Sequence, residues 1–469
     1  MILGDRDRDT ICAVSSPPGY GGISVIRISG SVALSLCRKI CSFIPATAHS
    51  HHAYFGTLKD KLTDEDIDEV IATVFHHNKS FTGEETVEIS CHGSPVICQR
   101  ILQNLVDVGA RMADPGEFTY RAFMGGRIDL IQAESVLSMV SAKSQQGAKQ
   151  ALRQLKGALS EELELLESDV TWCLAHLEAG IDFSENGLDL KDGQILTDRL
   201  ATVKKRLITF IESYRFGRNV RDGFRVVIAG APNVGKSSLF NALIGEDRAI
   251  VTNIAGTTRD LIETSFNYMG YQFVLTDTAG LHESSDFIER KGMEKSTGAM
   301  ADTDVVLVVF DLSKGPDVAA LEKIDFLNSG RAIFVGNKVD LVEDPELELL
   351  SAQRLLQEFG ICIDSKDQYV ILSALTKKNV DSLKSALLRL VNEEKFRDQS
   401  SISQARHFEN LFKAEASIQL AINSLASRLS SEFIALDLKE ALIKIQETLG
   451  KRFDDQVMDR VFKEFCIGK

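Results

Sequence analysis

Apolar residues recur at intervals of three and four in two stretches of the chain. The first stretch contains Leu152, Leu155, Leu159, Leu163 and Leu166. The second contains Leu411, Ala414, Ile418, Ile422, Leu425 and Leu429, and is followed by Leu438, Leu442, Ile445 and Leu449. This spacing places the apolar side chains on one face of an α-helix. We therefore predict one long helix over the first stretch, another over 197–216 and further helices over the second, packed as a bundle.

A different pattern precedes these helices. Residues 1–121 hold short strand-like runs at 23–28, 70–75 and 86–90, which glycine and proline interrupt. A helix is predicted over 96–108. The mixture predicts a compact α+β domain, and its pattern alone indicates no catalytic site.

Residues 220–394 alternate strand-like and helix-like runs, as is typical of a doubly wound α/β sheet. Helix formers dominate on both sides, where no proline occurs between Pro115 and Pro232 and none follows Pro345. Since the ends of a domain often lie close together, we expect the helices on both sides to form one bundle into which the α/β domain is inserted. The predicted division is 1–121, 122–219, 220–394 and 395–469.

One stretch of the α/β segment carries a phosphate-binding pattern. Residues 230–237 (GAPNVGKS) fit G-x-x-x-x-G-K-[ST], between the β-branched run 225–229 and a helix-like run that Gly245 ends. The glycines let main-chain N–H groups surround phosphates, and the helix N-terminus adds partial positive charge. We expect Lys236 to reach the β- and γ-phosphates and Ser237 to bind Mg²⁺.

Three further stretches, each after a strand-like run, favour guanine over adenine. They are Asp277-Thr278-Ala279-Gly280, Asn337-Lys338-Val339-Asp340 and Ser373-Ala374-Leu375. The carboxylate of Asp277 is suited to hold Mg²⁺ through water, and the N–H of Gly280 to meet the γ-phosphate. The carboxylate of Asp340 is suited to accept from N1–H and the 2-amino group of guanine, which adenine lacks. Residues 373–375 offer main-chain N–H groups to the base. The four motifs in this order predict a GTP-binding domain.

Composition and charge bear on what the protein binds and where in the cell it is found. The formal net charge of the 469-residue chain is −14, so the bulk composition does not indicate a nucleic-acid or membrane surface. No apolar run approaches the roughly 20 residues of a membrane span. The eight cysteines have no paired C-x-x-C spacing, which indicates neither zinc nor a disulfide framework. We expect a cytoplasmic protein.

The sequence pattern leaves more than one choice for the residue that orients the water for GTP hydrolysis. Many such domains place a glutamine after the DxxG element to orient the attacking water, but here Leu281 and His282 follow Gly280. The alternatives for a base or water-orienting group are Glu283, Asp286 and Glu289. A monovalent cation held by carbonyls and the Asn233 amide is one source of positive charge, and loop stabilisation is the other explanation of Asn233.

These residues together resemble the MnmE family of tRNA-modification GTPases, also called TrmE, over essentially the whole chain. In the α/β domain, 250–260 (IVTNIAGTTRD) is similar to the family's potassium loop and first switch, and 277–290 (DTAGLHESSDFIER) to its second switch. The other matching segments are 17–23 (PPGYGGI), 27–30 (RISG), 80–85 (SFTGEE), 115–119 (PGEFT), 180–184 (GIDFS) and 465–469 (FCIGK), the last resembling a C-terminal C-x-G-K signature.

The resemblance implies a potassium-activated GTPase that works in a hetero-oligomer with the flavoprotein MnmG (GidA). Together they would form the aminomethyl-type (carboxymethylaminomethyl) group at C5 of the wobble uridine of certain tRNAs. FAD and NADH are expected on the partner. The resemblance also implies a homodimer whose N-terminal domain binds a tetrahydrofolate derivative, in its 5,10-methylene or 5-formyl form.

The resemblance also assigns site residues. The implied folate contacts are Arg27, Glu88, Arg127 and Lys469. Arg127 stands where a lysine is common, which keeps the charge but changes its geometry, and Cys466 has either a role in the chemistry or one in packing. The implied potassium ligands are Asn233, Thr252, Ile254 and Thr257, and the Mg²⁺ ligands are Ser237 and Thr258. Glu289 would orient the water, with Lys236 and Asn233 as the other catalytic residues. The remaining GTP contacts implied are Val234, Gly235, Ser238, Asn253, Ala255 and Gly256.

Two other functions fit part of this pattern. A ribosome-assembly or signalling switch GTPase would carry the same nucleotide motifs, but neither the folate-type N-terminal matches nor the terminal C-x-G-K belongs to a generic switch. A folate-dependent one-carbon transfer enzyme regulated by GTP would act without tRNA. Analysis of tRNA nucleosides separates both from the main interpretation.

Overall fold

The structure is a computed structural model that describes residues 9–183, 190–245, 264–277, 303–317, 331–359, 368–391, 400–463, 465 and 468. Its contacts divide the chain into two compact units, which are described separately. Unit 1 comprises Met1–Leu137, Gln154–Val203 and Ala416–Lys469, and unit 2 comprises Ser138–Arg153 and Lys204–Glu415. Among the described residues, no helix combines the length and the apolar character that crossing a membrane requires.

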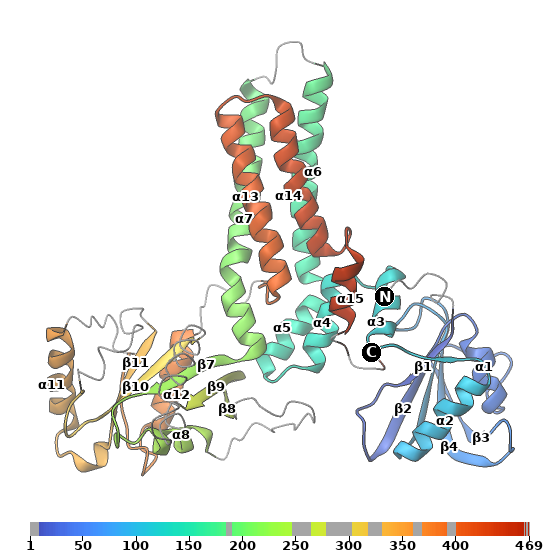
Figure 1. The fold of residues 1–469 in the computed structure, drawn as a ribbon, viewed down its shortest axis with the longest axis horizontal. Helices are drawn as coiled ribbons and strands as arrows, with labels where there is room; N and C mark the ends of the chain where they lie inside the picture. The colour runs from blue at the N-terminus through green and yellow to red at the C-terminus, as the bar shows by residue number, and fades with distance from the viewer. Residues whose placement is uncertain are drawn as a thin grey trace, which may run out of the picture. The chain divides into compact units, whose positions relative to one another are not determined.

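The first part of unit 1 is a six-stranded sheet with helices (Figure 1). Its strands are β1 (Ile11–Val14), β2 (Gly21–Ser29), β3 (His52–Lys59), β4 (Asp66–Phe75), β5 (Thr86–Gly93) and β6 (Arg111–Met112). Its helices are α1 (Ala33–Ile40), α2 (Pro95–Asp107) and α3 (Glu117–Met124). The strand order is β3-β4-β5-β2-β1-β6, antiparallel except for β1 with β6. The predicted α+β domain is confirmed, with its three strand-like runs in β2, β4 and β5.

Helices make up the rest of unit 1 and part of unit 2. They are α4 (Leu130–Val140), α5 (Gln145–Leu155), α6 (Ala158–Phe183), α7 (Leu190–Asp222), α13 (Ala405–Ala426), α14 (Ser431–Leu449) and α15 (Asp455–Lys463). In Figure 1, α14 runs beside α6, where Leu163 and Leu438 are fully buried. The predicted α-helical bundle is confirmed, as is the helix over 197–216, which lies inside α7.

One helix prediction was wrong. The stripe from Leu152 to Leu166 occupies two helices, because the chain turns at Gly157 between α5 and α6. Gly157 has φ = +93°, in the left-handed region that glycine adopts without strain. The side-chain amide of Gln132 donates to the carbonyl of Leu155 at 3.1 Å, which satisfies a carbonyl at the end of α5.

The single tryptophan of the chain is half-buried in the helical bundle. Trp172 on α6 has the guanidinium of Arg199 on α7 above its ring, 4.1 Å from the ring centre. The Nε of Arg199 also donates to Asp169 at 3.0 Å, and the ring of His176 lies 3.6 Å from that of Trp172, centre to centre. These contacts join α6 to α7.

The α/β part of unit 2 holds a second six-stranded sheet. Its strands are β7 (Phe224–Ala229), β8 (Thr264–Tyr268), β9 (Tyr271–Asp277), β10 (Val305–Asp311), β11 (Ala332–Asn337) and β12 (Tyr369–Ile371). Its helices are α8 (Lys236–Ile244), α11 (Pro345–Glu358), α12 (Val380–Val391) and a 3₁₀ turn at Val339–Leu341. The order is β12-β11-β10-β7-β9-β8, parallel except for the β8–β9 hairpin.

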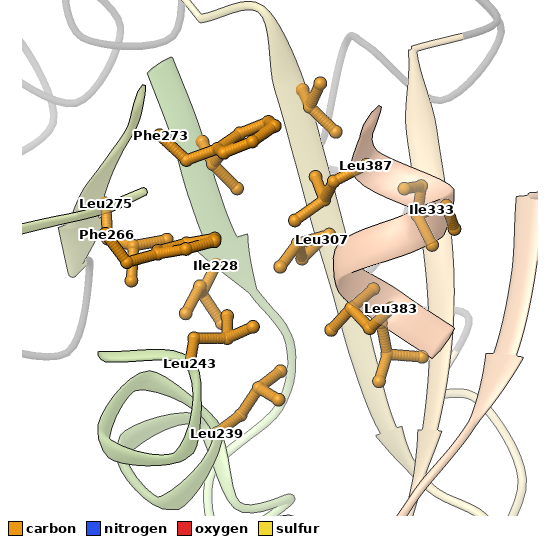
Figure 2. Close-up of a cluster of buried hydrophobic side chains, with 14 of the residues drawn as sticks. Ile228, Leu239, Leu243, Phe266, Phe273, Leu275, Leu307, Ile333, Leu383 and Leu387 are labelled. Atoms are coloured by element: carbon orange, nitrogen blue, oxygen red, sulfur yellow. The ribbon is translucent and has the colours of Figure 1, made fainter. Parts of the chain in front are cut away.

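Helices cover both faces of this sheet. On one face, Leu239 and Leu243 of α8 and Leu383 and Leu387 of α12 pack against strand residues such as Ile228 (Figure 2). On the other face, α11 packs in a second apolar cluster with β10 and β11. Strands buried on both faces read as continuous apolar runs, as 305–310 does. This is the doubly wound arrangement that the alternation predicted.

The α/β part is inserted between bundle helices. The chain leaves α7 through Gly223 (φ = +96°) directly into β7. After α12 it returns to α7 before starting α13, and there the N–H of Ile402 donates to the hydroxyl of Ser213 at 3.2 Å. The guanidinium of Arg221 donates to the side chain of Gln404 at 2.7 Å. The entry and exit of the insertion thus lie side by side, as predicted, while the exact domain boundaries stay a prediction.

Candidate nucleotide-binding site and a second polar site

The predicted phosphate loop connects β7 to α8. Gly230 and Gly235 have φ = +150° and +99°, both in the region that favours glycine. A Cβ atom on Gly230 would collide with the carbonyl oxygen of Val309, and one on Gly235 with the amide of Asn337. Both glycines are therefore required by backbone conformation and by close approach. The loop delivers the chain to the N-terminus of α8, where main-chain N–H groups are available to an anion.

The polar side chains of the loop are exposed or partly buried. Lys236 donates from Nζ to the carbonyls of Gly230 and Ala231 at 3.0 and 2.9 Å, so its ammonium lies inside the loop. Ser237 and Ser238 are exposed on the first turn of α8, where their hydroxyls are accessible to a metal ion or a phosphate. Asn233 is also exposed and has φ = +63°.

A buried amide joins three of the predicted motifs. The side chain of Asn337, which is 2% exposed, donates from Nδ2 to the carbonyl of Val234 at 2.8 Å. Its Oδ1 accepts from the N–H of Ala374 at 2.9 Å. One side chain thus fixes the phosphate loop to the segment 373–375. Only a side chain with both a donor and an acceptor can satisfy both partners.

Lys338 makes a second connection to the phosphate loop. It has φ = +67°, and its Nζ donates to the carbonyl of Asn233 at 2.9 Å and to Oδ2 of Asp311 at 2.8 Å. Burial alone would raise the pKa of Asp311, but hydrogen bonds from Lys338 and Ser313 hold that pKa below its ordinary value. Asp311 therefore stays ionised and anchors the lysine.

Asp311 was not predicted from the sequence as a residue of this site. An acidic residue directly after the continuous apolar run 305–310, at the same edge of the sheet as the other motifs, would have indicated it. The carboxyl ends of β7, β9, β10, β11 and β12 share this edge because these strands are parallel. Ligands of doubly wound sheets bind at such an edge.

The remaining predicted nucleotide contacts divide into two groups. Asp340 is exposed in the 3₁₀ turn, Ser373 is fully buried, and Leu375 is 83% exposed. Asp277 ends β9 opposite Ile228 of β7. The other predicted residues lie outside the described residues, namely Thr252, Asn253, Ile254, Ala255, Gly256, Thr257, Thr258, Thr278, Ala279, Gly280 and Glu289. The roles assigned to all of these residues stay predictions.

A second polar site lies on the sheet of unit 1. Arg27 on β2 and Glu88 on β5 occupy opposite register positions, and Nε of Arg27 donates to Oε1 of Glu88 at 2.9 Å. The Arg27 guanidinium also lies over two aromatic rings, 5.1 Å from the centre of Phe81 and 5.6 Å from that of Phe118. Arg127 is anchored beside them, since its Nε donates to the carbonyl of Ser80 at 3.2 Å. Three of the four predicted folate contacts are thus grouped around the loop 80–81.

The end of the chain approaches the same sheet. A Cβ atom on Gly468 would collide with the carbonyl of Val14 at the end of β1, and Gly468 has φ = +93°. The hydroxyl of the neighbouring Ser15 is buried without a hydrogen-bond partner in the part of the chain that the structure describes. Lys469 and Cys466 lie outside the described residues.

The fold and the loop define a P-loop nucleotide-binding protein, with the NKxD element and the phosphate loop joined by Asn337 and Lys338. Comparison with known protein families identifies the family to which this P-loop protein belongs. Residues 10–127 match the family model described as "GTP-binding protein TrmE N-terminus", and residues 130–466 match the one described as "MnmE helical domain".

Proteins called tRNA modification GTPase MnmE are similar over the full length. That of Bdellovibrio bacteriovorus is 49% identical over 476 residues, covering 100% of this chain and 99% of that protein. That of Chlorobium phaeobacteroides is 38% identical over 473 residues, covering 98% and 97%. Among solved structures, the G domain of the T. maritima FeoB iron transporter is 28% identical and covers 36% of this chain and 99% of that chain, with a TM-score of 0.26. The chain belongs to the MnmE family of tRNA modification GTPases.

Proposed function

We propose that this protein hydrolyses GTP as part of a tRNA wobble-uridine modification carried out in the cytoplasm with the flavoprotein MnmG (GidA). The product would be the carboxymethylaminomethyl-type group at C5 of the uridine in certain tRNAs, and the protein would act as a homodimer. The main support is the candidate nucleotide site, in which Asn337 connects the phosphate loop to the segment 373–375, in a chain 49% identical to a protein named tRNA modification GTPase MnmE. FAD and NADH would be bound by the partner.

The guanine base would be held by the two connected loops. The carboxylate of Asp340 is exposed beside the anchored Lys338, so it is available to accept from N1–H and the 2-amino group. Residues 373–375 would contact the base through the main chain. The N–H of Ser373 already donates to the carbonyl of Lys378 at 3.1 Å and that of Ala374 to Asn337 at 2.9 Å, so the N–H of Leu375 is left for this contact.

The phosphates would replace the internal contacts of Lys236. Its ammonium donates to two loop carbonyls that are close to where β- and γ-phosphates bind in such loops, so a short rotation of the side chain brings it to an anion. Ser237 and Thr258 would hold Mg²⁺, which offsets charge on the phosphates. Glu289 would orient the attacking water.

Potassium would be held by Asn233 together with Thr252, Ile254 and Thr257. The described residues support this proposal, because the main-chain carbonyl and the side-chain amide of Asn233 differ in their contacts. Its main-chain carbonyl is held by Lys338, while its exposed side-chain amide makes no hydrogen bond among the described residues. An amide oxygen is a suitable ligand for such a cation. The cation would supply positive charge where an arginine acts in other GTPases.

The potassium proposal has a direct test. GTP hydrolysis by the wild type and by Asn233→Ala is compared in KCl and in NaCl at equal ionic strength. We expect KCl to accelerate the wild type and to leave the variant at its NaCl rate. Pro316→Ala, outside these motifs, serves as a control that keeps the acceleration. Equal wild-type rates in the two salts would refute the proposal.

The second polar site would bind a tetrahydrofolate derivative, in its 5,10-methylene or 5-formyl form, which supplies the one-carbon unit. Arg27, Arg127 and Lys469 would hold folate carboxylates, and Glu88 would accept from the pterin edge. The site fits this group in two respects. Cationic side chains lie beside aromatic rings, and Ser15 has a buried hydroxyl without a partner among the described residues.

The deciding experiment is nucleoside mass spectrometry of tRNA from cells with and without the gene. We expect loss of C5-aminomethyl-type wobble uridines, restored by the wild type but not by Lys236→Ala. Normal tRNA in the deletion strain would instead favour a ribosome-assembly or signalling switch GTPase, whatever the rate of hydrolysis.

A further inference from the structure

A buried arginine connects three segments beside the second polar site. The side chain of Arg121 on α3 is 5% exposed. It donates from Nη2 to Oε1 of Glu117 at 2.9 Å, and from Nη1 to Oε1 of Glu84 at 3.2 Å and to the carbonyl of Asp9 at 2.7 Å. One guanidinium therefore fixes helix α3 both to the loop before β5 and to the segment before β1.

Its two carboxylate partners are themselves fully occupied. Glu117, with a side chain 2% exposed, accepts from both Nη atoms of Arg111 at 3.0 and 2.7 Å. Oε2 of Glu84 accepts from the hydroxyl of Ser29 on β2 at 2.7 Å. The cluster Arg121–Glu117–Arg111–Glu84, called the four-charge cluster below, thus joins two positive and two negative charges with oriented hydrogen bonds. The half-exposed carboxylate of Asp9 also pairs with Arg111, at 3.3 Å.

Such a cluster is an inefficient way to gain stability alone. Buried ion pairs lose much of their attraction to desolvation, and apolar residues of similar size often stabilise a fold equally well. The oriented hydrogen bonds instead hold the segments that they join in one defined position. We therefore expect the cluster to act through the position of these segments.

Two of the joined segments carry the aromatic rings beside Arg27. Phe81 lies three residues before Glu84, in the same loop, and Phe118 follows Glu117 on α3. Both rings lie within 5.6 Å of the Arg27 guanidinium, measured to the ring centres. Among the described residues, Arg27 makes its hydrogen bond to Glu88 and its ring contacts to Phe81 and Phe118, while the four-charge cluster holds the loop and the helix that carry these two rings.

Helix α3 also supports the end of the chain. Gly116 precedes α3 with φ = +72°, and a Cβ atom there would collide with the carbonyl of Phe462 on α15. The rings of Tyr120 and Phe462 pack edge to face with centres 5.4 Å apart. Gly468, beyond α15, then lies against Val14. The sheet and the C-terminal segment therefore meet through α3.

We infer that Arg121 is a positioning residue for the folate-binding site: by holding α3 between the loop at Glu84 and the C-terminal helix α15, it sets the positions of the two aromatic rings around Arg27 and of Gly468 against the sheet. The inference rests on the proposed folate function. It assigns Arg121 no contact with the folate, so its loss weakens folate binding without changing the nucleotide site.

The test compares Arg121→Lys with Arg100→Lys. The lysine at 121 keeps the charge but cannot reproduce the guanidinium's three directed contacts, whereas Arg100 is half exposed on α2 and pairs only loosely with Asp60 and Glu65, at 3.7 and 3.6 Å. The dissociation constant of 5-formyltetrahydrofolate is measured by calorimetry at 15 °C on the full chain. The thermal midpoint, and KM and kcat for GTP, are measured on the same samples.

We expect folate to bind about tenfold more weakly to Arg121→Lys and unchanged to Arg100→Lys, with GTP kinetics equal to wild type in both. Ser29→Ala is a second variant that leaves the guanidinium of Arg121 in place. It removes the hydrogen bond from Ser29 to Glu84 at 2.7 Å and the contacts of the same hydroxyl with Thr82 and Thr86 at 2.7 and 3.3 Å, with an expected loss of about threefold. Unchanged folate affinity in folded Arg121→Lys, or in Ser29→Ala if the former does not fold, would overturn the inference. A lower thermal midpoint alone would assign the cluster to stability. Failure of the wild type to bind folate would refute the proposed folate function itself.

Discussion

Lys338 donates a hydrogen bond to the main-chain carbonyl of Asn233 at 2.9 Å, joining two loops that are 105 residues apart in the chain. The same ammonium pairs with Asp311, so the loop that would read the base and the loop that would hold the phosphates share one anchor. A disturbance of this anchor is expected to change nucleotide binding at both ends.

Replacing Asp311 with alanine removes the anion that holds Lys338. We expect KM for GTP to rise about five- to tenfold with kcat within about twofold of wild type, because one charge-assisted hydrogen bond is lost and the loops become less ordered. Steady-state hydrolysis kinetics provide the measurement. Asp344→Ala is the matched control, since Asp344 caps α11 by accepting from the N–H of Leu347. A KM that rises equally in both variants would mean that the effect is general destabilisation.

The two loop glycines predict a severe effect of a single methyl group. Gly235→Ala places a Cβ against the Asn337 amide in a backbone conformation that alanine adopts only with strain of about 1–3 kcal/mol. We expect nucleotide affinity to fall at least tenfold, measured with a fluorescent GTP analogue. Gly193→Ala is the control, because Gly193 lies in α7 with no atom within 4 Å of the added Cβ. It should stabilise the helix by about 0.5–1 kcal/mol, and a nucleotide-affinity loss in this control would contradict the explanation.

The buried Glu117 predicts acid sensitivity of the N-terminal domain. Burial alone would raise its pKa, but hydrogen bonds from Arg111, the N–H of Asp114 and Arg121 hold that pKa below the ordinary value for glutamate. A depressed pKa means that the ionised form contributes stability above the pKa of the unfolded chain. This contribution is lost as the pH falls through the lower, folded-state value.

The measurement is denaturant unfolding of wild type and Glu117→Gln over a series of pH values. We expect the variant to be less stable at neutral pH, and the difference in free energy of unfolding to shrink as the pH falls. A difference independent of pH would show that ionisation of Glu117 does not provide its stability.

Buried cysteines predict low thiol reactivity. Cys12, Cys37, Cys41, Cys91, Cys98 and Cys173 are free and buried. Burial raises the pKa of Cys12 and Cys41 to about 12, and that of Cys173 to about 11. Since the thiolate is the reactive form, roughly 10⁻⁴ of a thiol with a pKa of about 12, and roughly 10⁻³ of one with a pKa of about 11, is reactive at pH 8. We expect iodoacetamide followed by peptide mass spectrometry to leave these six unmodified in the native protein and to modify them after unfolding. Rapid native labelling of Cys12 would contradict its burial.

The sequence predicted those features that depend on neighbouring residues. The phosphate loop, its strand and its helix follow from residues 225–244 alone, and strand-like runs predicted β2, β4 and β5 of the first sheet and β7, β9, β11 and β12 of the second. Features that depend on distant residues were missed. Asn337 contacts Val234 across 103 residues, Arg121 contacts Glu84 across 37, and neither pairing has a local signal. The break at Gly157 was missed because the apolar spacing continues through it.

The tryptophan on α6 determines what intrinsic fluorescence can report for this chain. Trp172 is the only tryptophan, and its contacts with Arg199 and His176 belong to the helical bundle. An emission signal excited at 295 nm therefore originates in the bundle and not at the nucleotide loop. A change in the emission spectrum on adding GTP would therefore report a rearrangement between α6 and α7, without any label on the protein.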